Sequence, residues 1–262
     1  MMLEKQSKSF LMRQMSSYFF NFSILKIRVG EYDANGFKAP EAEVHEEYTV
    51  ARILKHPAFN PARLSNDIAI LFVDRNINLN HPYINTACLP SCNEQFDFQF
   101  SNGTGVRCWV AGWGKNEFDG SFQSLQRKVD VPLVNNAQCN ADLKTALNSQ
   151  ARGVGDRFTL DPSEVCAGGE VGKDACTGDG GSPLVCQASS GRWTVVGLVT
   201  WGVGCADQLP GVYVRVSQFR EWIDNNNADI VNSVVENEVV VGEIDVPRTL
   251  GDKNPEVSIR FA

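Results

Sequence analysis

The sequence lacks the features of a membrane or nucleic-acid-binding protein. No apolar run approaches the roughly 18 residues of a membrane-spanning helix. Positive charge is not in excess either, since 24 Lys and Arg residues face 31 Asp and Glu residues for a formal net charge of −7. An acidic balance argues against nucleic acid and anionic membrane surfaces as general partners. We therefore expect no nucleic acid and no membrane among its partners.

Histidine is scarce, with only His45, His56 and His81 in 262 residues. His45 lies in a polar stretch, His56 follows an apolar stretch, and His81 precedes a proline. Histidine often lies on protein surfaces without a catalytic role. We predict that each of the three is an exposed loop residue.

The eight cysteines form no C-x-x-C zinc pattern, and their spacings are long and uneven. Such a set favours a disulfide framework over a metal site. The glycosylation sequons at Asn21 and Asn102 also fit a secreted protein. We therefore expect an extracellular protein, and nothing in the sequence predicts a cofactor or a metal.

The two ends of the chain differ in composition from its middle. Residues 1–23 show no clear period and are not a convincing signal peptide, so we leave them unassigned, as a spurious leader. Residues 24–226 form the predicted domain, and residues 227–262 form a C-terminal extension. A secreted-looking protein without a signal peptide suggests that the true beginning of the chain is missing.

Short runs of alternating polarity, separated by Gly, Pro, Asn or Asp, predict an all-β barrel or sandwich. The predicted strands are residues 24–30, 48–54, 66–73, 107–112, 126–133, 183–186, 193–200 and 211–216. Helices are predicted over residues 136–147 and 216–224. In the second helix Ser217 is the expected N-cap, and Phe219, Trp222 and Ile223 are expected to face inward.

The stretch Cys176-Thr-Gly-Asp-Gly-Gly-Ser-Pro-Leu-Val-Cys186 resembles the nucleophile loop of the trypsin/chymotrypsin-like serine proteases, which reads G-D-S-G-G-P. Other motifs of that family follow in the right order: Asn66-Asp-Ile-Ala-Ile-Leu, Cys108-Trp-Val-Ala-Gly-Trp-Gly, Val199-Thr-Trp-Gly-Val-Gly-Cys, Pro210-Gly-Val-Tyr and Phe219-Arg-Glu-Trp-Ile. The resemblance covers roughly residues 25–226. It implies an all-β fold of two six-stranded antiparallel barrels with a short C-terminal helix.

The beginning of the family pattern is not found in this chain. Neither an Ile-Val-Gly-Gly start nor an Ala-Ala-His-Cys segment is present. We therefore expect the N-terminal barrel to lack its first strands and to have unpaired edges. A gene model truncated at its 5′ end explains this pattern.

The resemblance also implies a loss of catalysis. Serine attacks, histidine carries the proton and a buried aspartate orients the histidine, a division of labour first described in these proteases. Asp67 stands at the aspartate position, the histidine is absent, and Gly180 stands at the serine position. Glycine cannot form an acyl-enzyme. Ser182 lies two residues further on, roughly 6 Å away by chain geometry, so we expect it to hydrogen-bond the turn rather than to attack.

The substrate-binding half of the protease pattern is kept. By resemblance, Asp174 lies at the base of a pocket that prefers Arg or Lys, and Gly202 and Gly211 form its open walls. A residual acidic group in a collapsed pocket is an equally weighted alternative for Asp174. The amides of Gly178 and Gly180 correspond to the oxyanion hole. Asp179 matches the residue that pairs with the freed N-terminus, so without that N-terminus we expect an unformed, zymogen-like loop.

The resemblance also implies the disulfide pairs, which are Cys108–Cys186, Cys139–Cys166 and Cys176–Cys205. Cys88 matches a cysteine that links to an upstream segment. Cys92 either joins Cys88 or has its own upstream partner, and we favour upstream partners because four residues are awkward to close. The acidic residues between Glu31 and Glu47 resemble a calcium-binding loop of some family members, but we expect a solvated acidic loop.

The stretch Glu164–Pro183 is most similar to the arthropod clip-domain serine protease homologues, in which glycine replaces the nucleophile. That resemblance implies a secreted, non-catalytic regulatory cofactor in an immune, melanisation-type protease cascade. Its partners would be proteases or prophenoloxidase-type zymogens. Two alternatives stay open: an active trypsin-like endopeptidase that cleaves after Arg or Lys, and a truncated fragment that does not fold.

Overall fold

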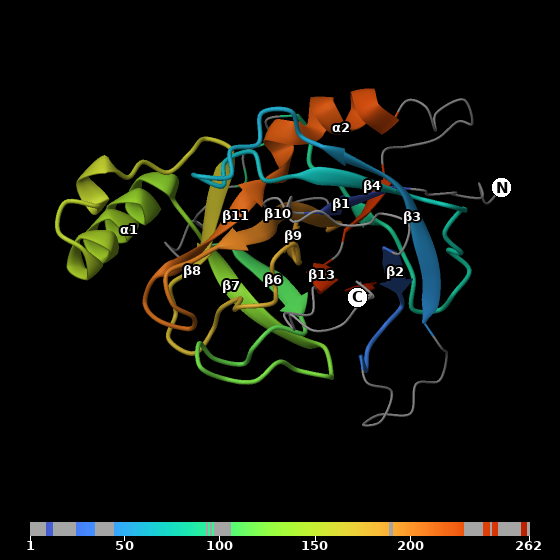
Figure 1. Cartoon of the computed structure of the whole chain (residues 1–262), viewed down its shortest axis with the longest axis horizontal. Helices are drawn as coiled ribbons and strands as arrows, with labels where there is room; N and C mark the ends of the chain where they lie inside the picture. The colour runs from blue at the N-terminus through green and yellow to red at the C-terminus, as the bar shows by residue number, and fades with distance from the viewer. Residues whose placement is uncertain are drawn as a thin grey trace, which may run out of the picture.

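The structure is a computed structural model of the whole chain (Figure 1). It describes residues 9–12, 25–34, 45–92, 94, 96, 106–188, 191–227, 238–241, 243–245 and 258–260. The predicted sequons at Asn21 and Asn102 lie outside these residues. None of the described helices is long and apolar enough to cross a membrane.

The C-terminal half of the domain is a closed barrel of antiparallel strands. Its strands are β6 (Arg107–Gly112), β7 (Arg127–Val134), β8 (Glu164–Gly168), β9 (Pro183–Gln187), β10 (Trp193–Trp201) and β11 (Pro210–Arg215). They pair in the order β11-β8-β7-β6-β9-β10, and a further pairing of β10 with β11 closes the ring. The predicted all-β fold is confirmed by this barrel, although the sequence pattern had not indicated β8.

The N-terminal half is built on three antiparallel strands, β2 (Lys26–Val29), β3 (Glu46–Lys55) and β4 (Ala69–Val73). Five shorter strands add to them: β1 (Ser9–Met12), β5 (Ala87–Cys88), β12 (Glu238–Val241), β13 (Glu243–Asp245) and β14 (Ser258–Arg260). Here β1 pairs with β4, and β14 pairs with β2. Among the described strands, the order of this half runs from β5 to β13 without a pairing that closes it.

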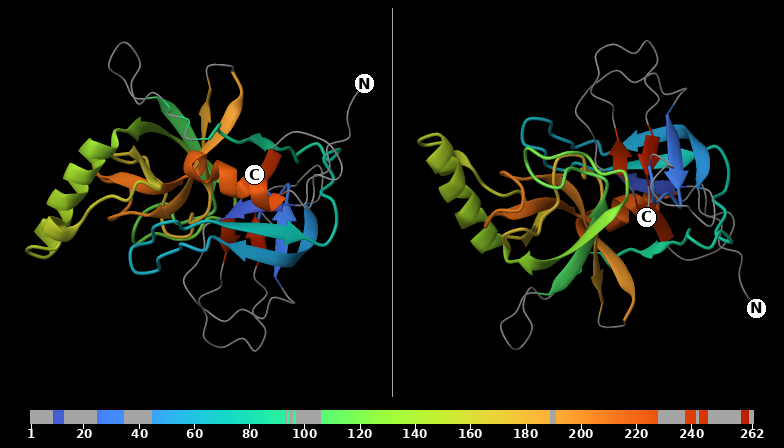
Figure 2. Two further views of the ribbon diagram at one scale, coloured as in Figure 1. Left: turned by 90° about the horizontal axis from the view of Figure 1, so that it is seen from above. Right: turned by 90° about the horizontal axis from the view of Figure 1, so that it is seen from below.

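The strand β4 joins the two halves because both of its faces are buried. Ala69, Leu71 and Val73 belong to the core of the N-terminal half. Ile70 and Phe72 point the other way, into a core shared with β10, β11 and the C-terminal helix. A strand buried on both faces reads as a continuous apolar run, and Figure 2 shows the two halves that it connects.

Two helices flank this arrangement (Figure 1). Helix α1 (Asn136–Gln150) confirms the first prediction and extends it; Asn135 caps it by accepting a hydrogen bond from the backbone N–H of Ala137. The second helix begins as a 3₁₀ turn, η3 (Val216–Phe219), and continues as α2 (Arg220–Asn227). Ser217 is therefore not the N-cap, because it lies buried inside the turn.

All three disulfides implied by the family resemblance are formed. They join Cys108 to Cys186, Cys139 to Cys166 and Cys176 to Cys205. Cys88 lies half-buried in β5, where its sulfur accepts a hydrogen bond from Arg192 Nε at 3.1 Å. Cys92 is exposed, and no disulfide joins it to Cys88.

Removing the Cys139–Cys166 bridge, as Cys139→Ala with Cys166→Ala, should lower the free energy of unfolding by roughly 3 kcal/mol. The bridge spans 27 residues and restricts the unfolded chain. Urea unfolding followed by circular dichroism measures the change. The matched control is Cys176→Ala with Cys205→Ala, which opens a span of 29 residues and should cost about the same. A loss below about 1 kcal/mol in the first variant would contradict this prediction.

Candidate functional site

Asp67 lies just before β4, at the junction of the two halves, and its side chain is fully buried. Its Oδ2 accepts a hydrogen bond from the Thr200 hydroxyl at 2.8 Å. Thr200 belongs to β10 of the closed barrel and is itself buried. A positive φ of 55° at Asn66 turns the chain immediately before Asp67. The sequence therefore places an acidic side chain of the N-terminal half against the wall of the C-terminal barrel.

The loop between Cys176 and β9 contains a hydrogen-bonded turn. The backbone N–H of Asp179 donates to the carbonyl of Cys176 at 2.9 Å. Gly178 sits within this turn at a φ of +103°, a conformation that glycine adopts without steric cost. The turn is closed by its own backbone hydrogen bonds.

The carboxylate of Asp179 is buried beneath this turn. It accepts hydrogen bonds from the backbone N–H of Gly114 at 2.8 Å and of Cys176 at 2.9 Å. Burial raises the pKa of this carboxyl group, and the two N–H donors oppose the rise. A side chain at Gly112 or Gly114 would collide with the carboxylate. The turn is thus tied to the end of β6 through Asp179.

Ser182 lies below the surface of the same loop. It is 1% exposed, and its backbone N–H donates to the carbonyl of Asp179 at 3.0 Å. Its hydroxyl oxygen lies 2.9 Å from where a Cβ on Gly112 would stand, toward the barrel. A hydroxyl buried in this position cannot reach an external carbonyl group, which agrees with the prediction that Ser182 does not attack.

Asp174 lies between β8 and Cys176, where two backbone amides hold its carboxylate. The donors are the N–H groups of Ala175, at 2.8 Å, and Ala206, at 3.1 Å. Burial is the main cause that raises the pKa of Asp174 to about 6. The group is therefore a partly desolvated carboxylate whose described partners are neutral N–H donors.

Glycines leave space beside the Asp174 carboxylate. A Cβ on Gly211 would lie 3.2 Å from Asp174 Oδ1, so a larger side chain there would cover the carboxylate. Gly202 faces Gly211, and a Cβ on Gly202 would lie 4.0 Å from the Cα of Gly211. The hydroxyl of Tyr213 is buried next to Gly211 and makes no hydrogen bond among the described residues. The predicted pocket residues Asp174, Gly202 and Gly211 are thus brought together.

The segment from Gly172 to Cys176, which contains Asp174, is fastened to the segment that contains Cys205 and Ala206, and both are fastened to the barrel. The disulfide Cys176–Cys205 joins them, and Gly172 donates its N–H to the carbonyl of Ala206 at 2.8 Å. On the outside, Arg107 binds both carboxylate oxygens of Glu170 at 2.8 Å, and Lys173 pairs with Asp130 at 2.8 Å. The bidentate Arg107–Glu170 pair fixes the relative orientation of the two side chains as well as pairing their charges.

All three histidines lie in loops, as predicted, but each is half-buried rather than exposed. His45 is half-buried and pairs with Glu31 at 3.0 Å. The ring of His56 packs edge-on against Phe219 and Trp222, with centroids 5.0 and 4.9 Å away, and burial lowers its pKa. His81 Nδ1 accepts a hydrogen bond from the backbone N–H of Tyr83.

The start of the acidic segment is not solvated, which corrects a further prediction. Glu31 and Asp33 are 3% and 2% exposed. Glu31 pairs with His45, and Arg28 lies 3.5 Å from the same carboxylate. Residues 35–44 of this segment lie outside the described part. Within the described part, no group of three or more His, Cys, Asp or Glu residues is placed to hold a metal ion.

Sequence reasoning missed two further residues of the site. Thr200 was visible within the Val199-Thr-Trp-Gly motif, but nothing in the sequence indicated its bond to Asp67 across 133 positions. Phe122 is 56% exposed, and its ring edge would stand 2.6 Å from a Cβ on Gly178. The edge of the Phe122 ring therefore covers one side of the turn, and the rest of the ring is exposed to solvent.

A closed antiparallel barrel, a buried Asp67, a cysteine-bracketed glycine turn and an Asp174 carboxylate beside Gly211 together match the architecture of a trypsin-type domain. The family model described as "Trypsin" matches residues 23–223. The chain belongs to the trypsin family.

Three curated relatives are similar to the chain over most of its length. "Inactive CLIP domain-containing serine protease A3" of Aedes aegypti is 45% identical over 80% of this chain and 42% of the relative. "Phenoloxidase-activating factor 2" of Galleria mellonella is 40% identical over 78% of this chain and 64% of the relative. "Inactive CLIP domain-containing serine protease A28" of Anopheles gambiae is 37% identical over 78% and 50%. The chain thus spans about half the length of the curated relatives it matches.

Replacing Thr200 by valine should lower the free energy of unfolding by about 2 kcal/mol, because it removes a donor to a buried carboxylate. Thr200→Ser is the control, since it keeps the hydroxyl and loses only a methyl group, at about 1 kcal/mol. Urea unfolding of both variants measures the difference. Equal stability of the two variants would show that the hydrogen bond to Asp67 contributes little.

Proposed function

We propose that this protein is a non-catalytic protease homologue. It binds a basic side chain of a partner protein in the Asp174 pocket and does not cleave the partner. The observation that carries the proposal is the pairing of a desolvated Asp174 carboxylate, flanked by Gly211 and Gly202, with a turn whose nucleophile position is Gly180. A glycine offers no atom for covalent attack. Binding is therefore kept where bond cleavage is lost.

The missing nucleophile and base support the absence of catalysis. Ser182 is buried in the turn, and the three histidines contact other parts of the fold. Loss of one triad member already costs several orders of magnitude in rate. The relatives named as inactive proteases fit the same proposal.

The chemistry of the pocket favours a cation. Asp174 is held by two neutral N–H donors, and burial disfavours its negative charge. A Lys or Arg side chain would supply the missing opposite charge, and Gly202 and Gly211 leave space for it. Arginine is the better fit to a carboxylate because its planar fork can donate two parallel hydrogen bonds.

We place the protein outside the cell, in a protease cascade of the melanisation type. Three disulfides favour an oxidising compartment. One similar relative is named a phenoloxidase-activating factor. The proposed partners are proteases or prophenoloxidase-type zymogens that expose an Arg or Lys residue.

An aryl amidine such as p-aminobenzamidine should bind the 262-residue chain in a fluorescence titration. Asp174→Asn should weaken its binding by at least about 30-fold, because a desolvated charge pair is lost. The matched control Asp119→Asn removes an exposed carboxylate that does not act on Asp174, and it should change the Kd by less than about threefold. Equal binding by the wild type and Asp174→Asn, or no binding at all, would refute the pocket.

The same binding should depend on pH through Asp174. The pKa of this carboxyl is raised to about 6, so below pH 6 binding of a cation requires the loss of a proton. Through Asp174 alone, the amidine Kd should therefore be about tenfold higher at pH 5 than at pH 7. A pH-independent Kd would show that a different group binds the cation.

Catalytic inactivity has its own test. The wild-type chain should not be labelled by an organophosphonate serine probe, and it should not cleave an Arg-containing chromogenic peptide. Gly180→Ser should remain inactive in the 262-residue chain, because a serine without a general base is a weak nucleophile. Labelling of the wild type would establish the alternative of an active endopeptidase, and the absence of a cooperative melt would establish the alternative of a non-folding fragment.

A further inference from the structure

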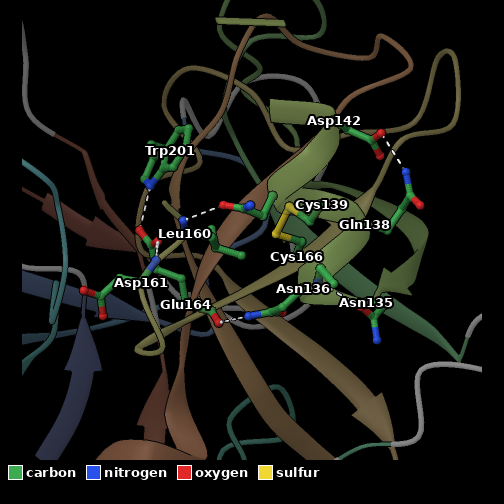
Figure 3. Close-up of a disulfide and its surroundings, with 12 residues drawn as sticks. Asn135, Asn136, Gln138, Cys139, Asp142, Leu160, Asp161, Glu164, Cys166 and Trp201 are labelled. Atoms are coloured by element: carbon green, nitrogen blue, oxygen red, sulfur yellow. Dashed lines mark hydrogen bonds between the residues drawn. A yellow bond between two sulfur atoms is a disulfide. The ribbon is translucent and has the colours of Figure 1, made fainter. Parts of the chain in front are cut away.

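Trp201 is the last residue of β10 and stands directly before Gly202. Its indole Nε1 donates a hydrogen bond to Glu164 Oε1 at 2.8 Å (Figure 3). Its ring meets the ring of Phe158 edge-on, with centroids 5.7 Å apart. The same ring packs against the cluster around the Cys139–Cys166 disulfide. A single polar bond therefore fixes the nitrogen end of a half-buried ring at the edge of the pocket.

Glu164 is an unusual residue for its position, because it is a carboxylate on a strand whose residues are all buried. It is 2% exposed, and its second oxygen accepts the backbone N–H of Asp161 at 3.0 Å. Both partners of the carboxylate are neutral N–H donors. Burying a carboxylate without a cation costs free energy of desolvation. The Trp201 hydrogen bond offsets part of this cost, which an apolar side chain at position 164 would not incur.

The charged groups that face Glu164 come from several elements. Asp161, in the turn before β8, and Asp67, before β4, both oppose its ionisation. The guanidinium of Arg215, on β11, donates to the backbone carbonyl of Glu164 at 3.0 and 3.2 Å. Burial is the largest influence and, with the charges of Asp161 and Asp67, raises the pKa of Glu164 to about 7, although the hydrogen bonds from Trp201 and from the Asp161 backbone oppose the rise. The carboxyl therefore changes charge near neutral pH.

We propose that Glu164 is a positioning residue for Trp201: its ionised carboxylate holds the indole at the rim of the Asp174 pocket, and its protonation weakens that hold. The negative charge strengthens the indole hydrogen bond, because bonds to a charged acceptor are roughly twice as strong as neutral ones. The link from Trp201 to partner binding rests on the proposed function, whereas the link from Glu164 to Trp201 does not.

The rim matters because its residues lead directly to the pocket. Gly202 follows Trp201 and faces Gly211, which stands beside Asp174. The pairing of β10 with β11 is irregular between Val199 and Trp201, so the backbone at this point lies outside the regular ladder. A change in the strength of the Trp201 hydrogen bond would thus shift Gly202, which belongs to the pocket wall that a basic side chain would pass.

The fluorescence of Trp201 tests the first link. Subtracting the spectrum of Trp201→Phe from that of the wild type isolates Trp201 among the five tryptophans. This difference spectrum should titrate between two states with a midpoint near pH 7. Glu164→Gln keeps the shape and an acceptor oxygen but carries no charge, so its Trp201 signal should stay in the low-pH state from pH 5.5 to 8.5.

Two controls separate positioning from a merely structural role. Asp174→Asn should keep the Trp201 titration, because the indole donates its hydrogen bond to Glu164 and the Asp174 carboxylate is bonded to Ala175 and Ala206. Glu221→Gln, which removes an exposed carboxylate of α2, should keep it as well. A titration that persists unchanged in Glu164→Gln, or a wild-type signal that does not change between pH 5.5 and 8.5, would overturn the proposal.

The amidine titration tests the second link. In the wild type, the pH dependence of the Kd should contain a component with a midpoint near 7 in addition to that of Asp174, and Glu164→Gln should lose this component. If the wild type shows the Trp201 titration and Glu164→Gln lacks it, but the amidine does not bind, the proposed function fails and the positioning role stands. If the amidine binds with the same pH dependence in both proteins, the influence of Glu164 on the pocket is refuted.

Discussion

The buried carboxylate of Asp179 is the contact on which the geometry of the site depends. It accepts N–H groups from Cys176, within the turn, and from Gly114, beyond the end of β6, and so fixes the turn to the barrel. Space for it exists because residues 112 and 114 are glycines. By family resemblance this carboxylate would pair with a freed N-terminus. Here backbone donors hold it in place of a cation, and this explains why the turn is ordered.

Asp174 and Glu164 repeat the same arrangement. Each is a desolvated carboxylate whose side-chain bonds come from neutral N–H donors, and burial raises the pKa of Asp174 to about 6 and of Glu164 to about 7. Charges of one sign concentrated in a partly dry region create a potential that attracts the opposite sign. Only Asp174 also has glycines beside it that leave space. Under the proposed function, that combination, rather than the acidic charge of the chain as a whole, makes Asp174 the position that receives a basic side chain.

The sequence could predict features that depend on local pattern or on recognisable motifs. Alternating polarity located most strands, and the motif positions located the disulfide pairs and the residues around Asp174. It could not predict contacts between residues far apart in the chain, such as Thr200 with Asp67. Ser217 failed as an N-cap because the shared core buries it within the 3₁₀ turn. Glu31 was expected in solvent, but pairing with His45 and Arg28 allows its burial.

The physical contacts that hold the pocket are separate from those that catalysis would need. The pocket is fastened by Cys176–Cys205, by the Arg107–Glu170 and Lys173–Asp130 pairs and by backbone amides. None of these contacts involves a side chain at position 180, so glycine there leaves them unchanged. In a protease, a bound partner leaves by cleavage as well as by dissociation. Under the proposed function only dissociation remains, and the lifetime of the complex is then set by the fit of the pocket alone. Loss of the nucleophile would in this way convert a transient substrate contact into a lasting protein–protein contact.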